Sequence, residues 1–248
     1  MKCTILGCGR YQITSNYNST GNLITTHQIK LVLDFGRGNL HALTQLGYTV
    51  NDIDVICISH THPDHVADLL AFFQAHFIDY KRGLTTRQLH IIGPSGIRRW
   101  FSTIASLVQE DLGYQPVLYE APTRPIIIGD VSITTASVQH NVPALGYRIS
   151  CDQKTVMYSG DTGYTDQLFK LAHNADVAIL ECSNAPDQTS EFHLNPQACG
   201  EIASSANVRQ LVLTHYGGTE RIPELQRETG KYFSGILTVA EELLSFNL

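Results

Sequence analysis

The sequence lacks the features that mark secreted, membrane-spanning and multi-domain proteins. Its longest apolar runs are far shorter than a membrane span, and its first residues, MKCTILGCGRY, lack the apolar core of a secretion signal. The 248 residues contain no linker, low-complexity run or internal repeat. We therefore expect a single cytoplasmic domain over residues 1–248, without a membrane segment.

Basic residues and paired cysteines are also scarce. The 17 Lys and Arg stand against 23 Asp and Glu, which gives a net charge of −6, and no basic stripe is visible. A protein that grips a long phosphate backbone normally shows such a stripe, so a small substrate is favoured over a long nucleic acid. The six cysteines form no CxxC pair, and several lie in apolar contexts, which predicts reduced packing residues.

What the sequence does contain is a dense group of metal-preferring side chains in the run HTHPDH, directly after the apolar run VICI. Side chains alternate in extended chain, so His60 and His62 can face one centre. Pro63 holds His62 out of the helical region. Asp64 is then expected at the N-cap of a helix, where Asp64 and His65 can face a second centre. This spacing predicts that a metal binds here.

Short β-like segments alternate with helical patterns, which indicates an α/β fold. Strands are predicted at residues 3–6, 23–26, 31–34, 55–58, 89–92, 117–118, 126–128, 131–137, 147–150, 155–158, 177–181 and 210–214. Helices are predicted at residues 39–46, 64–80, 94–110, 165–173 and 196–205. Four metal-preferring residues follow the ends of apolar β-like runs: His60, His140, Asp161 and His215. Such ends lie along one edge of a layered α/β fold, so we expect these side chains to converge.

The chain resembles the metallo-β-lactamase superfamily over nearly its whole length, and most closely the ribonuclease Z-like phosphodiesterases. The phrases that carry the resemblance are SHTHPDHVADL, HNVPALGYRI, SGDTGYTDQL, ADVAILECS, HLNPQACGEIA and LVLTHY. The resemblance implies an αββα sandwich of two packed mixed β-sheets with helices on the outer faces. It also implies a homodimer, to which the aromatic residues of segment 72–84 could contribute, although core packing explains them equally well.

The resemblance further implies a site for two divalent metal ions. Zinc is preferred, and manganese or iron would also suit a ligand set without sulfur. The implied ligands of one ion are His60, His62 and His140, and those of the other ion are Asp64, His65 and His215. Asp161 is implied to bridge the two ions. Two such ions lower the pKa of a shared water, so the expected nucleophile is a hydroxide that bridges them.

Catalytic roles are implied for His193 and Glu181, as well as for Asp64. In ribonuclease Z-like enzymes a His before the penultimate helix lies near the leaving oxygen, and a Glu orients it. The runs FHLN and LECS stand at the corresponding places. His193 would then protonate the departing alkoxide, which suits a group with a pKa near neutrality. The alternative is that His193 only caps the helix that begins at Pro196.

The early run GCG resembles the start of a dinucleotide fingerprint, but no third glycine follows at the required place, so we reject that interpretation. The polar segment after it is expected to form a loop over the metal edge. Substrate contacts are expected from such loops, at residues 8–21 and 216–235.

Chain length separates the reactions known in the superfamily. True β-lactamases are secreted, and this sequence shows no secretion signal. Flavodiiron proteins need an attached flavin domain, for which the chain has no room. Glyoxalase II carries a helical C-terminal domain, whereas only 33 residues follow His215 here. Ribonuclease Z carries a tRNA-grasping arm after its third metal-ligand motif. Only 20 residues separate His140 from Asp161, so that arm is absent.

The sequence resembles the shorter, armless relatives, some of which hydrolyse cyclic nucleotides, including the phage anti-Pycsar phosphodiesterases. The predicted function is therefore metal-dependent hydrolysis of a small phosphodiester, with a cyclic nucleotide as the favoured substrate. The alternatives are a tRNA 3′-processing endoribonuclease, a lactonase or other ester hydrolase of the same fold, and a non-catalytic binding protein that uses metals for stability.

Overall fold

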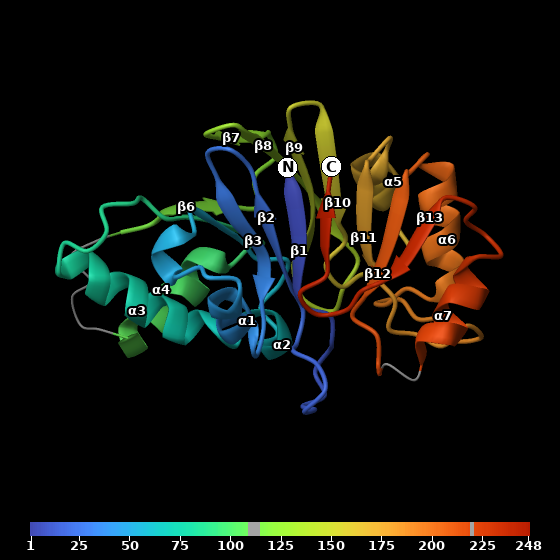
Figure 1. The fold of residues 1–248 in the computed structure, drawn as a ribbon, viewed down its shortest axis with the longest axis horizontal. Coiled ribbons are helices and arrows are strands. Elements are labelled where there is room, and N and C mark those ends of the chain that lie inside the picture. The colour runs from blue at the N-terminus through green and yellow to red at the C-terminus, as the bar shows by residue number, and fades with distance from the viewer. Residues whose placement is uncertain (109–114, 219–220) are drawn as a thin grey trace.

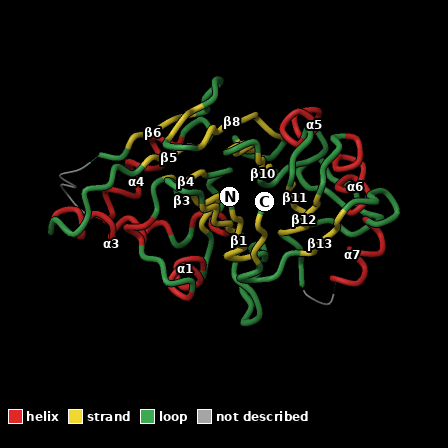
Figure 2. Tube along the Cα trace, turned by 45° about the horizontal axis from the view of Figure 1, so that its top comes forward, coloured by secondary structure: helices red, strands yellow, loops and turns green. Residues whose placement is uncertain are grey.

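Two seven-stranded β-sheets pack face to face in the computed structural model, with helices on their outer faces (Figures 1 and 2). The structure describes residues 1–108, 115–218 and 221–248. The predicted αββα sandwich is confirmed. The predicted helix 94–110 is observed from Ile97 to Val108, and its last two predicted residues lie outside the described ones.

The first sheet takes its strands from the N-terminal half and from the last residues: β1 (Lys2–Gly7), β2 (Gly21–Thr25), β3 (Lys30–Phe35), β4 (Val55–Cys57), β5 (His90–Gly93), β6 (Val117–Glu120) and β14 (Ser245–Asn247). They are arranged in the order β14-β1-β2-β3-β4-β5-β6, and β3 to β6 run parallel. Because β14 pairs antiparallel with β1, the two termini lie side by side near the middle of the molecule (Figure 1).

The second sheet takes its strands from the C-terminal half: β7 (Ile126–Ile128), β8 (Val131–Val138), β9 (Ala144–Cys151), β10 (Lys154–Tyr158), β11 (Val177–Glu181), β12 (Gln210–Thr214) and β13 (Ile236–Val239). Its order is β13-β12-β11-β10-β9-β8-β7, and β10 to β13 run parallel. Strands β9 and β10 form the predicted antiparallel hairpin.

Helices cover the outer face of each sheet, as the red segments at the two sides of Figure 2 show. Those beside the first sheet are α1 (Asn39–Gln45), the short 3-10 helix η1 (Val50–Asp52), α2 (Pro63–Val66), α3 (Leu69–Lys81) and α4 (Ile97–Val108). Those beside the second are α5 (Asp166–Ala172), α6 (Pro196–Ser205) and α7 (Ile222–Thr229). Within the described ranges, none of these helices has the length and apolar character that crossing a bilayer would require.

Strand alternation in the first sheet separates two layers of the core. On β3, Leu31 and Leu33 point between the two sheets, whereas Val32 points to the layer under helices α1 to α4. Both layers are fully buried, which explains why the parallel strands read as nearly continuous apolar runs. Phe72, Phe73 and the other aromatic residues of the second layer are core residues, so core packing accounts for them. The homodimer stays a prediction.

The predicted helix 64–80 is wrong as one element, because it is two helices, α2 and α3, with a break at Ala67 and Asp68. The Asp68 side chain accepts a hydrogen bond from the backbone N–H of Leu40 at 2.8 Å, and the Asp68 N–H donates to Phe35 at 3.3 Å. These bonds tie the chain to β3 and to the first turn of α1. The helix therefore restarts after Asp68 instead of continuing.

The predicted N-cap position of Asp64 is also wrong. His62 occupies the N-cap position, with φ −64° and ψ 147°, and Pro63 is the first helical residue. Proline suits that place because its φ is already helical and the N–H that it lacks would have no partner there. Asp64 lies one residue further in, so its carboxylate is not used as a cap and remains available to the site.

Candidate metal centre

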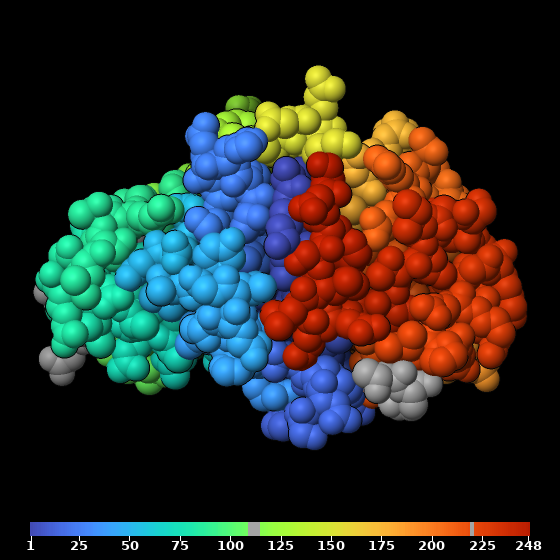
Figure 3. Space-filling model, viewed as in Figure 1, coloured from blue at the N-terminus to red at the C-terminus, as the bar shows by residue number. Residues whose placement is uncertain are grey.

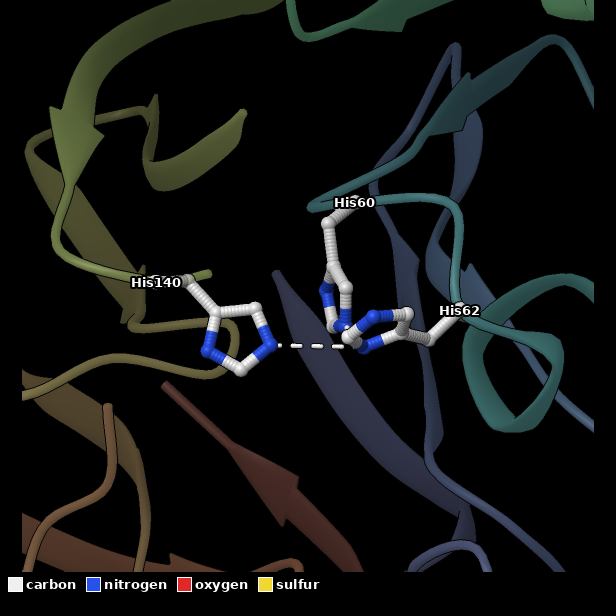
Figure 4. A group of neighbouring side chains, drawn as sticks. All are labelled: His60, His62 and His140. Carbon is white, nitrogen blue, oxygen red and sulfur yellow. Dashed lines mark hydrogen bonds between the residues drawn. The ribbon is translucent and has the colours of Figure 1, made fainter. Parts of the chain in front are cut away.

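Three imidazoles from two sheets meet at one point. His60 and His62 follow β4, and His140 follows β8 on the other sheet. The Nδ1 atom of His62 lies 2.9 Å from Nε2 of His60 and 3.3 Å from Nε2 of His140, and Figure 4 shows the three rings turned toward one another. The predicted convergence at the strand ends is confirmed for this group.

A second group lies beside the first and includes carboxylates. Nε2 of His215 is 3.3 Å from Oδ2 of Asp64, and Nε2 of His65 is 3.8 Å from the same oxygen. Asp161 lies between the groups, with Oδ1 3.3 Å from His65 Nε2 and Oδ2 3.9 Å from His60 Nε2. Each set of three could hold a metal ion by its spacing. The structure thus brings together all seven residues that the sequence singled out as ligands.

A buried carboxylate, Asp34, orients two of these imidazoles. Its Oδ2 accepts hydrogen bonds from His65 Nδ1 at 2.7 Å, from the Ser59 hydroxyl at 2.6 Å and from the Tyr158 hydroxyl at 2.7 Å. Because Ser59 gives its proton to Asp34, its oxygen is left to accept from His60 Nδ1, 3.1 Å away. His65 and His60 therefore both turn Nε2, with its free electron pair, toward the cluster.

Sequence reasoning missed Asp34. The available signal was an acidic residue at the end of the apolar run LVLDF, where a buried carboxylate needs several partners. Its backbone has a φ of 57°, a left-handed conformation that costs a non-glycine residue on the order of 1 kcal/mol or more. The hydrogen bond from the Ser59 N–H to Oδ1, at 2.6 Å, helps to hold it there.

The histidines of the second sheet are oriented by other partners. Nδ1 of His140 donates to the Phe192 carbonyl at 3.3 Å. The Ser183 hydroxyl donates to the His215 carbonyl at 3.0 Å, so its oxygen accepts from His215 Nδ1 at 2.8 Å. Both imidazoles then present Nε2 to the cluster. Ser183 was also missed from the sequence, because the contact joins segments that are 32 residues apart.

The electrostatics of the cluster fit a cation. Nε2 of His65 and Oδ1 of Asp161 are buried, face each other, and have no hydrogen-bond partner among the described residues. Two electron-rich atoms in that position need a proton or a metal ion near them. Burial opposes protonation of His65, but the Asp161 and Asp34 carboxylates outweigh it and raise its pKa well above the usual value. Burial lowers the pKa of His140 to about 4, which keeps it neutral as a ligand must be.

His193 lies at the edge of the cluster and is paired with Glu181. Its Nδ1 is 2.8 Å from Oε1 of Glu181, which is 1% exposed and also accepts from the backbone N–H groups of Thr162 and Ser183. Burial lowers the pKa of His193, but the hydrogen bond and charge of Glu181 outweigh this and raise it. The side chain of Asn195 caps α6 by accepting from the Ala198 N–H, so the alternative of His193 as the cap is wrong.

The cluster opens into a cavity of about 580 Å³, which is within the range of small-molecule sites. Residues of both sheets and of the loop after β1 line it: Arg10, Tyr11, His62, Pro63, Asp64, His140, Asn141, Asp161, Ser183, Asn184, Gln188, His193 and His215. Arg10 and Tyr11 belong to the loop after β1, which therefore reaches the cavity at the metal edge, as predicted. The six cysteines are all free and buried, as predicted.

The fold and the cluster define an αββα protein with a candidate metal centre where strands of both sheets end. The chain belongs to the beta-lactamase superfamily, because the family model described as beta-lactamase superfamily domain matches residues 32–216, well over half of its length. The predicted resemblance to this superfamily is confirmed.

The chain is also similar to individual proteins and solved structures. The chain is 29% identical over 245 residues to the probable metallo-hydrolase YhfI of Bacillus subtilis, covering 97% of each chain. The crystal structure of YhfI has a TM-score of 0.88 at 27% identity and covers 99% of this chain and 98% of its own. Ribonuclease Z of Clostridium acetobutylicum is 24% identical, with 92% of this chain and 91% of that protein covered. The short form of human tRNase Z shares the fold, with a TM-score of 0.81 at 20% identity, over 100% and 99% of the two chains.

Proposed function

We propose that this protein is a dinuclear metal-dependent phosphodiesterase that hydrolyses a small phosphodiester, and that its substrate is a cyclic nucleotide. The observation that carries the proposal is the His193–Glu181 pair, which lies beside the cluster and at the same cavity. A purely structural metal site closes its coordination and has no use for an oriented imidazole next to it. The names of the relatives, a probable metallo-hydrolase and a ribonuclease, support hydrolysis.

The residues that would hold the two ions form two sets and a bridge: His60, His62 and His140; Asp64, His65 and His215; and Asp161. All are nitrogen or oxygen donors, which suits zinc and also manganese or iron. When bound, two such cations would supply Lewis-acid polarisation of phosphoryl oxygens and would lower the pKa of water.

The chain's own groups would then position the substrate and move one proton. Glu181 accepts from Nδ1–H of His193 and so leaves Nε2 to face the leaving oxygen of the phosphodiester; in the imidazolium form Nε2 also carries a proton, which that oxygen would take. The raised pKa of His193 favours the protonated form that a general acid needs. Glu181 acts as a positioning residue, since both of its oxygens are held by backbone N–H groups and it does not line the cavity.

A small substrate is favoured over a tRNA precursor. The segment between His140 and Asp161 contains the hairpin β9–β10 and no further element that could act as an arm. Arg10 is the only Arg or Lys among the described residues that line the cavity. The tRNA 3′-processing reaction remains the second candidate, because the similarity to ribonuclease Z extends over 92% of the chain.

The test is a product assay with metal-loaded protein on cyclic mononucleotides, cyclic dinucleotides, a lactone and a tRNA precursor, together with a His193→Ala variant. We expect hydrolysis of a cyclic nucleotide, and a loss of about 100- to 10,000-fold in the variant with metal content unchanged. His27→Ala is the matched control, because His27 is exposed in the loop between β2 and β3, away from the residues of the site.

Three outcomes would overturn the proposal. Cleavage of the tRNA precursor with the cyclic nucleotides left intact would establish the second candidate. Turnover of the lactone alone would make the protein an ester hydrolase of the same fold. Retention of both metals with no turnover of any substrate would favour a structural role for the ions.

A further inference from the structure

We propose that Arg10 and Tyr11 form a nucleotide-binding subsite, in which Tyr11 stacks on the base and Arg10 binds a phosphate, and that the ligand is a mononucleotide. The proposal rests on the proposed function, because it assigns the substrate class of the same cavity. Both residues lie in the segment between β1 and β2, which projects from the body of the protein as the dark blue lobe at the bottom of Figure 3.

The base of this projecting segment is held in place. The Gly9 N–H donates to the Asn18 carbonyl at 2.8 Å, and the Ser19 hydroxyl donates to the Arg10 carbonyl at 3.3 Å. The hydroxyl of Tyr17 donates to the Gly217 carbonyl at 2.9 Å, on the loop that follows β12. These hydrogen bonds hold the segment that carries Arg10 and Tyr11 in a fixed position next to the cluster. Less conformational entropy is then lost when a ligand binds.

Arg10 is oriented but keeps hydrogen-bond donors free. Its Nε donates to Gln12 Oε1 at 2.8 Å, and its Nη1 donates to the Ser183 carbonyl at 3.3 Å. A guanidinium has five N–H donors, so three remain beyond these two bonds in the described structure. Ser183 also orients His215, which places the guanidinium beside the candidate metal centre. A planar, fixed cation with free donors is suited to phosphate oxygens.

Tyr11 offers an aromatic face at the same cavity. The residue is 68% exposed although it lines the cavity, and it is the only Phe, Trp or Tyr among the described lining residues. The Arg10 guanidinium carbon lies 5.4 Å from the centroid of the Tyr11 ring, a cation–π contact that leaves the other face of the ring free to take a base. An exposed ring beside a candidate phosphate site is the pairing that nucleotides require, because every base has a π-face.

The charge of the cavity limits the size of the ligand. Arg10 is its one fixed cation among described residues, and the net charge of the chain is −6. A longer nucleic acid would need a row of such contacts to hold its backbone. One aromatic ring and one guanidinium suit one base and one phosphate. The ligand that fits this subsite is therefore a free mononucleotide and not a segment of a longer nucleic acid.

The experiment compares two ribose phosphates, one that carries a base and one that does not. Calorimetric titration of zinc-loaded protein with 5′-AMP and with ribose 5-phosphate gives the affinity ratio that the base contributes. We expect 5′-AMP to bind more tightly by about fivefold to a hundredfold, and Tyr11→Ala to remove that preference. Tyr11→Phe should retain it, because the ring remains. Arg10→Ala should weaken both ligands by a similar factor, since both carry the phosphate.

Ile13→Ala is the matched control, because Ile13 is 81% exposed on the same segment and does not line the cavity. Equal affinities for the two ligands in the unmodified protein, or an unchanged ratio in Tyr11→Ala, would overturn the subsite. A hexa-adenylate that binds far more tightly than 5′-AMP, with a steep salt dependence, would overturn the mononucleotide assignment. Neither 5′-AMP nor ribose 5-phosphate contains a phosphodiester bond, so their affinities can be measured whether or not the proposed hydrolysis occurs.

Discussion

The two halves of the candidate metal centre are built in different ways. The first sheet supplies its part from residues 60–65 after β4, and one carboxylate, Asp34, orients two of its imidazoles, His65 directly and His60 through Ser59. The second sheet supplies its part from the ends of separate strands, and its two imidazoles have separate partners, the Phe192 carbonyl for His140 and Ser183 for His215. Removal of the orienting side chain in the first half should therefore affect several ligands at once. Removal of one in the second half should affect a single ligand.

The largest expected effect is that of Asp34→Ala. The change leaves the buried His65 imidazole and the Tyr158 hydroxyl without their acceptor, in a region that is 0% to 1% exposed. We expect the free energy of unfolding of the metal-free protein to fall by about 3–5 kcal/mol, measured by urea denaturation. Metal binding should also be lost, because the orientation of two imidazoles depends on this carboxylate.

Asp54→Ala is the control for that variant. Asp54 also accepts a backbone hydrogen bond in the first sheet, from Lys30 at 2.8 Å, but just before β4, at the opposite end from the cluster. We expect a loss of about 1 kcal/mol and unchanged metal binding. If the two variants were destabilised equally and both still bound metal, the first half would not be organised by one residue.

A smaller and local effect is expected for Ser183→Ala. The hydroxyl fixes the tautomer of His215 by accepting from Nδ1, and it also donates a hydrogen bond to the His215 carbonyl. Both contacts hold a residue whose φ of 54° is left-handed. Loss of a partner that orients a metal ligand lowers metal affinity by about 10- to 100-fold. Competition with a chromophoric chelator should show this loss at one of the two proposed metal sites.

Ser204→Ala is the matched control, because the Ser204 hydroxyl also donates to a backbone carbonyl, that of Tyr232, but on the exposed side of α6. Its metal affinities should be those of the unmodified protein. An equal loss at both proposed sites in Ser183→Ala would show that the second half responds as a unit.

The same difference explains what the sequence could predict. The cluster of the first half was readable from HTHPDH alone, because its residues are adjacent and Pro63 fixes the backbone between them. His140, Asp161 and His215 were placed through the ends of apolar runs and a family resemblance. Asp34 and Ser183 were missed, since each acts on a residue distant in sequence and no local pattern records that contact.

Secondary structure follows the same rule. Buried parallel strands such as β11 and β12 were predicted, because continuous apolar runs specify them locally. Strand β14 was missed because it exists through pairing with β1, from the opposite end of the chain. The break between α2 and α3 was missed for a similar reason, since the partner of the Asp68 side chain is the first turn of α1.

The smallest expected effect is that of Asn195→Ala, which separates helix capping from site chemistry in the second half. Asn195 accepts the Ala198 N–H at 2.9 Å, two residues from His193, which is held instead by Glu181. Loss of the cap should cost about 1 kcal/mol and lower the Tm by about 2–4 °C, while Asn195→Asp should restore only the cap, because it lacks the Nδ2 donor that Asn195 gives to the Gln188 carbonyl at 3.0 Å. His193→Ala should lower the Tm by less, because the Glu181 carboxylate keeps the backbone N–H groups of Thr162 and Ser183 as partners. The reverse pattern, with stability lost only in His193→Ala, would mean that His193 supports the fold at α6. Helix capping and site chemistry would then not be divided between Asn195 and His193.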